Sequence, residues 1–489
     1  MSSRSSGARK SLTRFAFFSE KLGALAGPSA EGVQTRLYWL LVGFLALVFL
    51  TGGASRSDVQ SLIFLRPLAV LGCGLALLSL RREHLRKYRM LVWMAALVVI
   101  LAVAHLIPLP PAIWQALPGR EVIIGIDNIA GIKGEWRPLT MTPGAGRNAF
   151  FSLFVPLAVL LMVIQLGGEH LRRLALPVLI LGALSGILGI FQASGDPHGM
   201  LYFYRITNNG SAVGLFSNRN HQAVFLATMF PLLAVFASQS MKTEGAIKIR
   251  FAVAIGAAIT IIPLLLVTGS RLGLILGALG IASGWFIYRR PEATGVRRRT
   301  ERKSYVAPIL GGIAAVILGL LTIMASRAEA LKRLVGTNVG EEDRAQAWSL
   351  VSRMAHEHLP WGTGSGSFVE MYRQVEPVSS LAPVYFNHAH NDWLEVWMTF
   401  GIPGAVLMFL AVAVYIPGVW HVRSLGERRD SGMLVAQAGA VILFLFAVAS
   451  VVDYPLRTPS LACLFVLACC WMYSGLSNSS LSAGNRRRD

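Results

Sequence analysis

The sequence predicts an all-α polytopic membrane protein, and three observations carry that prediction. Hydrophobic residues make up 54 % of the 489-residue chain, whereas Asp, Glu, Lys and Arg together make up only 14 %. The mean hydropathy is +0.56, well above that of a soluble domain. Many separate apolar runs approach the roughly 20 residues that an α-helix needs to cross a bilayer. A β-barrel is excluded, because its strands would be short and would alternate apolar and polar side chains.

About twelve membrane-spanning helices are expected when the chain is read in windows of roughly 20 residues. A basic segment, 1–36, precedes the first span, and a short tail, 475–489, follows the last. The spans form two groups, 37–325 and 396–474, which the long polar interval 326–395 separates. The expected spans lie near residues 37–53, 61–80, 90–108, 149–166, 174–192, 221–238, 250–268, 271–288, 306–325, 396–418, 433–452 and 460–474.

The distribution of Lys and Arg predicts the orientation of these spans. About 29 of the 45 Lys and Arg residues fall in loops and termini that share one side of the twelve-span arrangement. The positive-inside rule assigns that side, with both termini, to the cytoplasm. The net charge of +20 is then accounted for by topology and by contacts with anionic membrane lipids, without a nucleic-acid partner.

The opposite face carries three sizeable loops, near 109–148, 193–220 and 326–395. The first is rich in Pro, Trp and Gly and is expected to lie on the membrane surface, with Trp114 and Trp136 as interfacial anchors. The third contains the Gly-rich segment Gly362–Phe368, which lacks the Lys-Ser/Thr pair of a P-loop. A flexible turn or lid is expected there instead of a nucleotide site.

The stretch Phe386–Gly404, with the sequence FNHAHNDWLEVWMTFGIPG, closes the third loop and leads into the tenth span. Asp392 and Glu395 have the spacing of a capping box, which predicts a helix that begins near Asn391. Apolar residues then recur at helical spacing. A histidine in this stretch would lie at the N-terminus of a membrane helix, where the helix dipole favours a neutral imidazole and bound anions.

His388 and His390 admit three interpretations. With Asp392 they could bind zinc, but side chains two residues apart on a helix diverge, and no third cluster of ligands is evident. They could be structural histidines. Acid–base or substrate work is the interpretation we favour, because a neutral imidazole beside a phosphate suits a general base. The outer segment Gly53–Gln60 holds no pair of acids, so a metal–carboxylate mechanism has little support.

Several arginines near the same face predict contacts with phosphate. Arg271, in TGSRL, interrupts a nearly continuous apolar stretch, where a charge is costly. It either reaches from a helix start to the membrane surface or binds a phosphate, which is attractive because no acid lies nearby in sequence. In GLFSNRNH, before the sixth span, Asn218 and Arg219 either cap the helix and reach to the membrane surface or contact an anionic or sugar substrate. Arg344 and Trp348 lie one turn apart on an expected loop helix, for which a solvated face is the default interpretation.

Together these features resemble the O-antigen ligase/polymerase superfamily of bacterial envelope glycosyltransferases. The matching features are about twelve spans, a large outer loop before the tenth, and His390-Asn391 followed by nine residues and Gly401. The last of these fits the family's His-(Asn/Ser/Gln)-nine-Gly signature. The motifs GLFSNRNH, TGSRLG and RAQAW also look like family features, and the resemblance covers roughly residues 180–415.

The resemblance implies a GT-C-like fold in the bacterial inner membrane and an inverting transfer that uses no metal and no cofactor. The donor would be a glycan on undecaprenyl pyrophosphate, and the acceptor a hydroxyl of a glycolipid such as lipid A–core. On the periplasmic side, His390 would activate the acceptor hydroxyl, and Arg271 and Arg344 would clamp the pyrophosphate. Further substrate contacts are expected from Asn218, Arg219, Trp348, His388, Asn391 and Asp392.

Two alternatives to a ligase stay open at this point. An O-antigen or exopolysaccharide polymerase of the same superfamily would share the chemistry and differ in its acceptor, a second lipid-linked glycan. A secondary transporter is also commonly built from about twelve spans, but it would show ionisable residues inside the membrane and two matching halves. The spans expected here are nearly free of acids.

Overall fold

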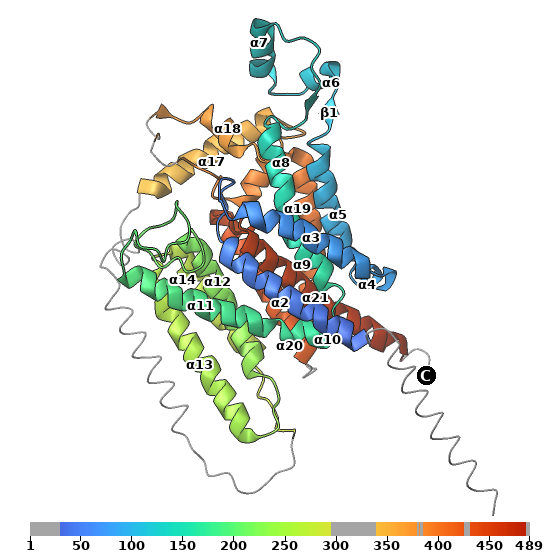
Figure 1. Cartoon of the computed structure of the whole chain (residues 1–489), viewed down its shortest axis with the longest axis vertical. Coiled ribbons are helices and arrows are strands. Elements are labelled where there is room, and N and C mark those ends of the chain that lie inside the picture. Colours follow the sequence, from blue (N-terminus) through green and yellow to red (C-terminus); the bar gives the residue numbers. More distant parts are fainter. Residues whose placement is uncertain (1–29, 295–338, 379–380, 382–384, 425–430, 486–489) are drawn as a thin grey trace, which may run out of the picture.

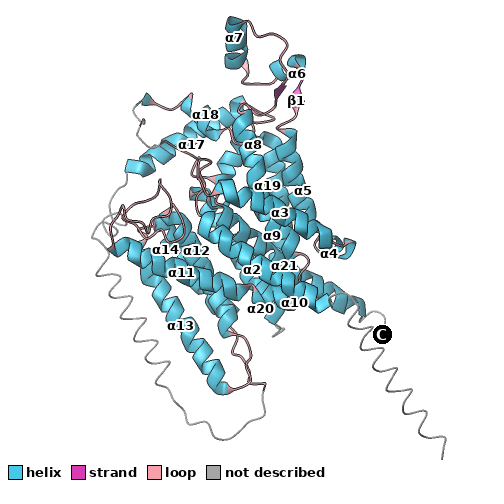
Figure 2. Ribbon diagram, viewed as in Figure 1, coloured by secondary structure: helices cyan, strands magenta, loops and turns pink. Residues whose placement is uncertain are grey.

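The computed structural model describes residues 30–294, 339–378, 381, 385–424 and 431–485. Helices dominate these residues (Figure 2). The longer helices are α2 (Ala30–Thr51), α3 (Leu62–Ser79), α5 (Arg89–Ala104), α11 (Ala175–Ser194), α12 (Arg219–Ala237), α13 (Glu244–Val267), α14 (Arg271–Ile287), α17 (Val339–Glu357), α19 (Asp392–Ser424), α20 (Ser431–Val452) and α21 (Pro459–Asn485).

Shorter elements connect the long helices. They are α4 (Arg82–Lys87), α6 (Pro111–Gln115), α7 (Glu121–Ala130), α8 (Pro143–Ser152), α9 (Phe154–Val163), α10 (Gly168–Arg173), α18 (Phe368–Arg373) and the 3-10 turn η2 (Pro455–Arg457). Two strands, β1 (Pro108–Leu109) and β2 (Arg137–Pro138), pair antiparallel with Pro108 opposite Pro138. The described residues therefore form an all-α protein with one very small sheet.

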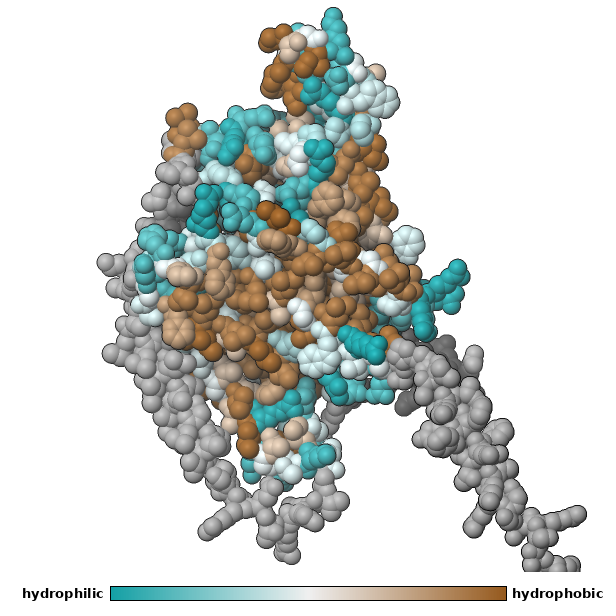
Figure 3. All heavy atoms as spheres, viewed as in Figure 1, coloured by the Kyte–Doolittle hydropathy of each residue, from teal (hydrophilic) through white to brown (hydrophobic). Residues whose placement is uncertain are grey.

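Eight helical stretches in the described residues are long and apolar enough to cross a membrane. The helices α5, α14 and the first part of α21 are apolar but shorter. Every expected span except 306–325 coincides with one of these helices, and 306–325 lies outside the described residues. Figure 3 shows apolar side chains as a broad band across the middle of the molecule, with hydrophilic residues gathered near α17 and α18 and at the opposite end.

The helix α12 is the centre of the bundle and is buried along almost its whole length. It packs against α11, α13, α14 and α20 (Figure 1). Glycines of α14 make the closest of these contacts, because a Cβ at Gly273 would lie 2.5 Å from that of Ala223 and one at Gly280 would lie 2.7 Å from the carbonyl oxygen of Ala227. The later residue of α14 contacts the later residue of α12 in these two pairs. The helices α12 and α14 therefore run parallel and begin at the same end of the bundle.

The Gly-rich segment Gly362–Phe368 is a buried junction, so the expectation of a flexible turn or lid is wrong. Its backbone N–H groups at Thr363 and Gly364 donate to carbonyl oxygens of α19 at 2.9 Å. Gly364 has φ +100°, and a Cβ there would lie 2.2 Å from the Cα atom of Thr140. The glycines are present because the first outer loop and α19 approach the segment too closely for side chains.

The helix α19 is broken where this junction meets it. Gly401 has φ +55° and ψ −140°, and the next backbone N–H, of Ile402, donates to the carbonyl oxygen of Pro360 at 2.9 Å. A Cβ at Gly401 would lie 2.2 Å from that same oxygen. Gly401, the glycine that follows Asn391 after nine intervening residues in the histidine signature, is therefore the point at which the loop before α19 packs against the helix.

The lobe formed by α6, β1, β2 and α7 projects from one end of the molecule (Figure 1). Trp114 is buried there, with the guanidinium groups of Arg120 and Arg137 at 5.6 and 5.5 Å from its ring. Its indole N–H donates to the carbonyl oxygen of Pro138 at 3.0 Å. The expectation that Trp114 is an interfacial anchor is therefore wrong, whereas Trp136 is 60 % exposed.

Candidate functional site

Polar and charged side chains from four distant segments meet at one end of the bundle. The segments are the loop 385–391 before α19, the start of α12, the connection 453–458 between α20 and α21, and the connection 52–61 between α2 and α3. Backbone contacts hold three of them together, because Gly52 accepts a hydrogen bond from the N–H of Ser460 and Gly53 accepts one from the N–H of Ser217. The site is therefore assembled by tertiary packing and not by one local motif.

The first residues of α19 form a buried charge network. The helix begins as predicted next to Asn391, whose Oδ1 accepts a hydrogen bond from the N–H of Leu394 at 3.0 Å. Asp392 does not cap the helix. Its carboxylate instead accepts a hydrogen bond from Nε of Arg457 at 3.1 Å and one from the hydroxyl of Ser450 at 3.2 Å. The expected capping box of Asp392 and Glu395 is therefore absent, and a tertiary ion pair takes its place.

Glu395 joins this network to the histidine loop. Its carboxylate lies 2.9 Å from Nδ1 of His388, accepts a hydrogen bond from the N–H of Ala389 at 2.9 Å, and lies 3.5 Å from Nη2 of Arg457. The Glu395 side chain is only 3 % exposed, so these partners stabilise its charge in place of water.

Arg457 is the cation of the network. Burial lowers its pKa, but the charges of Glu395 and Asp392 outweigh burial and hold the pKa above its ordinary value. The guanidinium group therefore stays charged between two carboxylates at every physiological pH.

His390 lies in a different environment from His388. It has φ +50°, the left-handed region that side chains other than glycine seldom occupy. Its Nδ1 is buried without a hydrogen-bond partner and lies 3.6 Å from Oδ1 of Asp453. Asp453 is fully buried, and its Oδ2 accepts a hydrogen bond from the side-chain amide of Asn220 at 2.6 Å. A second imidazole, that of His221, places its Nε2 3.8 Å from the same Oδ1 atom.

Tyr454 fills the space between the three histidines. Its ring centroid lies 4.6 Å from that of His388, 4.7 Å from that of His390 and 5.1 Å from that of His221. The phenol hydroxyl donates to Oδ1 of Asn387 at 3.3 Å. One aromatic ring thus fixes the relative positions of imidazoles that come from α12 and from the loop before α19.

Among the other predicted site residues, Trp348 contacts the histidine loop directly. Its indole N–H donates to the carbonyl oxygen of Ala389 at 2.8 Å, so it supports the histidine loop from α17. Asn218 caps α12 by accepting a hydrogen bond from the N–H of Asn220 at 2.8 Å. Arg219 is the first residue of α12, beside the amide that contacts Asp453.

The two arginines expected to bind pyrophosphate lie on α14 and α17. Arg271 is the first residue of α14, and because α14 runs parallel to α12 it lies at the same end of the bundle as His221. The backbone of Arg344 belongs to α17, but its side chain lies outside the described residues. Among the described residues, no three His, Cys, Asp or Glu side chains come together as a set of metal ligands.

The sequence reading missed the connection 453–458, which supplies Asp453, Tyr454 and Arg457. Its sequence, DYPLRT, lies between the expected spans 433–452 and 460–474. A signal was available, because an acid and an arginine between two long apolar runs are costly unless they are paired or functional. His221, at the end of GLFSNRNH, was likewise not singled out from its motif.

These observations define a polytopic helical membrane protein with a histidine–carboxylate site at one end of its helix bundle. Residues 256–409, a little under a third of the chain, match the family described as O-antigen ligase. The match confirms the resemblance to the O-antigen ligase/polymerase superfamily and supports ligase- or polymerase-type activity in general. A search of curated proteins finds no match to the chain.

The matched residues divide the site into two parts. They include Arg271 and the histidine loop with the start of α19. They exclude His221, Asp453 and Arg457, which complete the site from α12 and from the α20–α21 connection. The site therefore extends beyond the matched residues on both sides.

Proposed function

We propose that the protein transfers a glycan from undecaprenyl pyrophosphate to a hydroxyl of an acceptor glycolipid, lipid A–core in the ligase case. The observation that carries the proposal is His390. It lies within the residues that match the O-antigen ligase family, in a strained backbone conformation, with Nδ1 facing a buried carboxylate. Strain of this kind persists where surrounding structure enforces it, and it is common at functional sites.

The residues around His390 explain how the strain is maintained. Ala389, the preceding residue, donates its N–H to Glu395, and its carbonyl oxygen accepts the indole N–H of Trp348. The peptide groups on either side of Ala389 are thus fixed by two different helices. The imidazole is thereby oriented before substrate arrives, as electrostatic preorganisation requires.

In the proposed reaction, His390 acts through Nε2 as the general base. The acceptor oxygen forms a bond to the anomeric carbon while the bond from that carbon to the pyrophosphate oxygen breaks, and the hydroxyl proton passes to His390. Asp453 keeps the other proton on Nδ1 and stabilises the imidazolium that forms, as in a carboxylate–histidine pair of a hydrolase. Attack opposite to the leaving group inverts the configuration at the anomeric carbon.

The leaving group, undecaprenyl pyrophosphate, carries its own negative charge. We assign Arg271 and Arg344 to that charge, because a guanidinium group can donate two hydrogen bonds to one phosphate. This allows the transfer to proceed without a metal ion. The orientation that accompanies this proposal places both termini in the cytoplasm and the site on the periplasmic side of the inner membrane.

The decisive experiment is a transfer assay with purified protein in proteoliposomes. A labelled glycan on undecaprenyl pyrophosphate is offered with lipid A–core, with a second lipid-linked glycan, or with neither. Product on lipid A–core supports the ligase, and a lengthened lipid-linked glycan supports the polymerase. Failure to form product with either acceptor, or equal product from His390→Ala protein, would contradict the proposal.

A further inference from the structure

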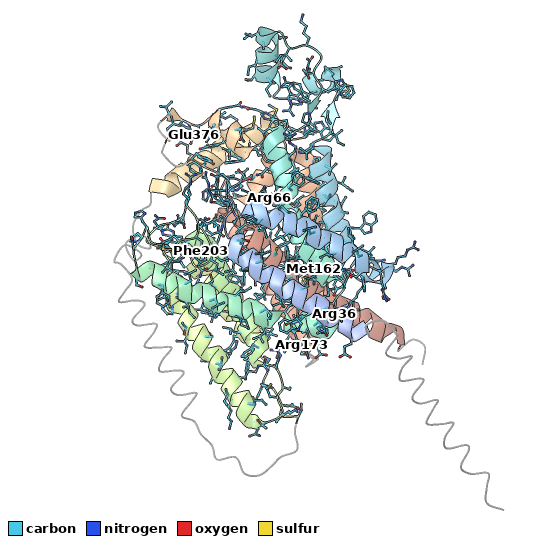
Figure 4. The ribbon with its side chains drawn as sticks, in the orientation of Figure 1. Arg36, Arg66, Met162, Arg173, Phe203 and Glu376 are labelled. Carbon is cyan, nitrogen blue, oxygen red and sulfur yellow. The ribbon has the colours of Figure 1, made fainter. Side chains whose placement is uncertain are left out.

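Arg66 is an arginine close to the lipid-facing surface, and it is not part of the histidine site. It lies one turn inside α3. Figure 4 shows it near one end of α3, and that end lies below α8. Its neighbours on the helix, Ile63 and Phe64, are 69 % and 72 % exposed and face the surface that the membrane would cover. A charged side chain at such a position is costly unless it has a partner.

The partners of Arg66 in the structure are neutral. Nη1 donates to Oδ1 of Asn148, and Nη2 donates to the hydroxyl oxygen of Ser152 at 3.4 Å. The hydroxyl proton of Ser152 is used elsewhere, because it is donated to the carbonyl oxygen of Asn148 at 2.8 Å. The third nitrogen of the guanidinium group, Nε of Arg66, is buried without a hydrogen-bond partner.

Arg66 therefore differs from Arg56 and Arg457. Arg120 and Arg250 also leave Nε without a hydrogen-bond partner, but their guanidinium groups lie over the rings of Trp114 and Phe236. Arg56, ten residues earlier, pairs with Asp58 at 3.0 Å, and Arg457 pairs with two carboxylates. No ion pair found within the described part of the chain includes Arg66. The α3–α8 face thus holds a positive charge whose Nε–H is unpaired, and the described residues supply no counter-charge for it.

We propose that Arg66, with Asn148 and Ser152, binds the phosphate group of a membrane lipid. A phosphate supplies the missing negative charge and can accept the unused Nε–H, and its tail can lie on the exposed apolar residues Ile63, Phe64 and Phe151. An anion without a tail would leave these apolar side chains uncovered. The surface is therefore matched to a molecule that is charged at one end and apolar along its length.

The helix that carries Arg66 follows a connection that contacts the histidine loop. The connection before α3 packs on the histidine loop, because Arg56 donates to the hydroxyl of Tyr385 at 2.8 Å and Asn387 donates to Ser55 at 3.3 Å. Arg66 follows that connection by one helical turn. The inference stands independently of the proposed transfer, since any phosphate-bearing lipid fits the chemistry.

The test measures binding to the full chain purified in a phosphate-free detergent, by native mass spectrometry and by the shift in Tm. The probes are undecaprenyl phosphate, phosphatidylglycerol, undecaprenol and inorganic phosphate. We expect one or both phosphate-bearing lipids to bind and to raise Tm, and the lipid that does so identifies the source of the phosphate. Undecaprenol, which lacks the phosphate, should bind at least about ten-fold more weakly than undecaprenyl phosphate if the latter is the ligand.

Three variants decide whether Arg66 is responsible. Arg66→Gln should weaken binding of the lipid about ten-fold or more. Asn148→Asp keeps Arg66 and places a carboxylate beside Nη1, so it should preserve the fold while competing with the phosphate, and it serves if Arg66→Gln does not fold. Arg147→Gln is the matched control, because Arg147 is an exposed arginine next to Asn148 on α8.

Four results would overturn the inference. They are unchanged binding in both Arg66→Gln and Asn148→Asp, an equal loss in Arg147→Gln, equally tight binding of undecaprenol, and Arg66-dependent binding of inorganic phosphate alone. The second would indicate general attraction to surface charge, and the last would indicate a free-anion site. Weakened lipid binding in Arg66→Gln and Asn148→Asp but not in Arg147→Gln supports the site.

Discussion

His388 and His390 are two residues apart, yet their surroundings differ in kind. His388 contacts both oxygens of Glu395, at 2.9 and 3.2 Å, within a network whose charges Arg457 completes. His390 occupies a left-handed backbone conformation, and its Nδ1 lies 3.6 Å from Asp453, beyond the length of a good hydrogen bond.

The difference indicates a structural role for His388 and a chemical role for His390. Around His388 each charge has a close partner of opposite charge or a hydrogen bond, which is how buried ions are tolerated. Around His390 the contacts are longer and the backbone is strained, which is how a group is held ready for a substrate. Variants of Arg457, His390 and Asp453 test this division, and their expected effects decrease in that order.

Removing Arg457 should have the largest effect on the folded protein. In Arg457→Gln, Asp392 and Glu395 stay buried without their cation, which costs about 3–5 kcal/mol of stability. We expect a large fall in Tm and in the yield of monodisperse protein in detergent. Arg82→Gln, at an exposed position on α4, is the control. A Tm equal to wild type in Arg457→Gln would show that the network does not stabilise the fold.

Replacing His390 should remove activity and leave the fold intact. We choose His390→Asn because asparagine tolerates the left-handed region. Transfer should fall by a factor of about 10²–10⁴, the usual contribution of a general base, with Tm unchanged and donor affinity close to wild type.

The matched control is His388→Asn. It should lose less activity and more stability, because Glu395 keeps Arg457 but loses one partner. Equal losses of transfer in the two variants would remove the distinction between the two histidines.

Asp453→Asn should have a smaller effect on the same step. The side chain keeps its size and its contact with Asn220, but it no longer stabilises a positive imidazole. We expect kcat to fall by a factor of about 10–10³ with little change in the KM for donor. Asp453→Glu should recover part of the loss. A change in KM alone, measured over a range of donor concentrations, would show that Asp453 acts on binding and not on His390.

His358, which lies outside the histidine site, gives the smallest effect, and the effect is tested by varying the pH. Burial lowers the pKa of His358, as does the charge of Arg120, although its hydrogen bond to Met354 and the charges of Glu357 and Glu121 act the other way. Because the folded pKa lies below the unfolded value of about 6.5, the unfolded chain takes up the proton first as the pH falls. The stability contributed by neutral His358 is complete above about pH 6.5 and is lost as the pH falls toward the folded pKa.

The measurement is Tm in detergent between pH 8 and pH 5 for wild type and His358→Gln. We expect the fall in Tm below about pH 6.5 to be smaller in the variant. Identical curves would show that other groups govern the acid side of stability.

The sequence predicted the features that depend on local pattern. Hydropathy located the apolar helices, and the polar boundary placed the start of α19 beside Asn391. It could not predict the pairing of Asp392 with Arg457, which lie 65 residues apart, because no local pattern encodes that contact. Gly362–Phe368 was misread for the same reason, since a Gly-rich segment is flexible alone and rigid only where other segments pack on it. Trp114 was misread because an amphipathic residue suits an interface as well as a core.

The six-residue connection between α20 and α21 has a consequence for how the chain can be divided. A fragment that ends at residue 409, where the family match ends, would contain Asp392 and Glu395 but not the guanidinium group between them. It would also contain His390 without its facing carboxylate. The last hairpin is therefore an integral half of the site, and a split version of the protein would recover its charge balance only when both pieces reassociate in the same membrane.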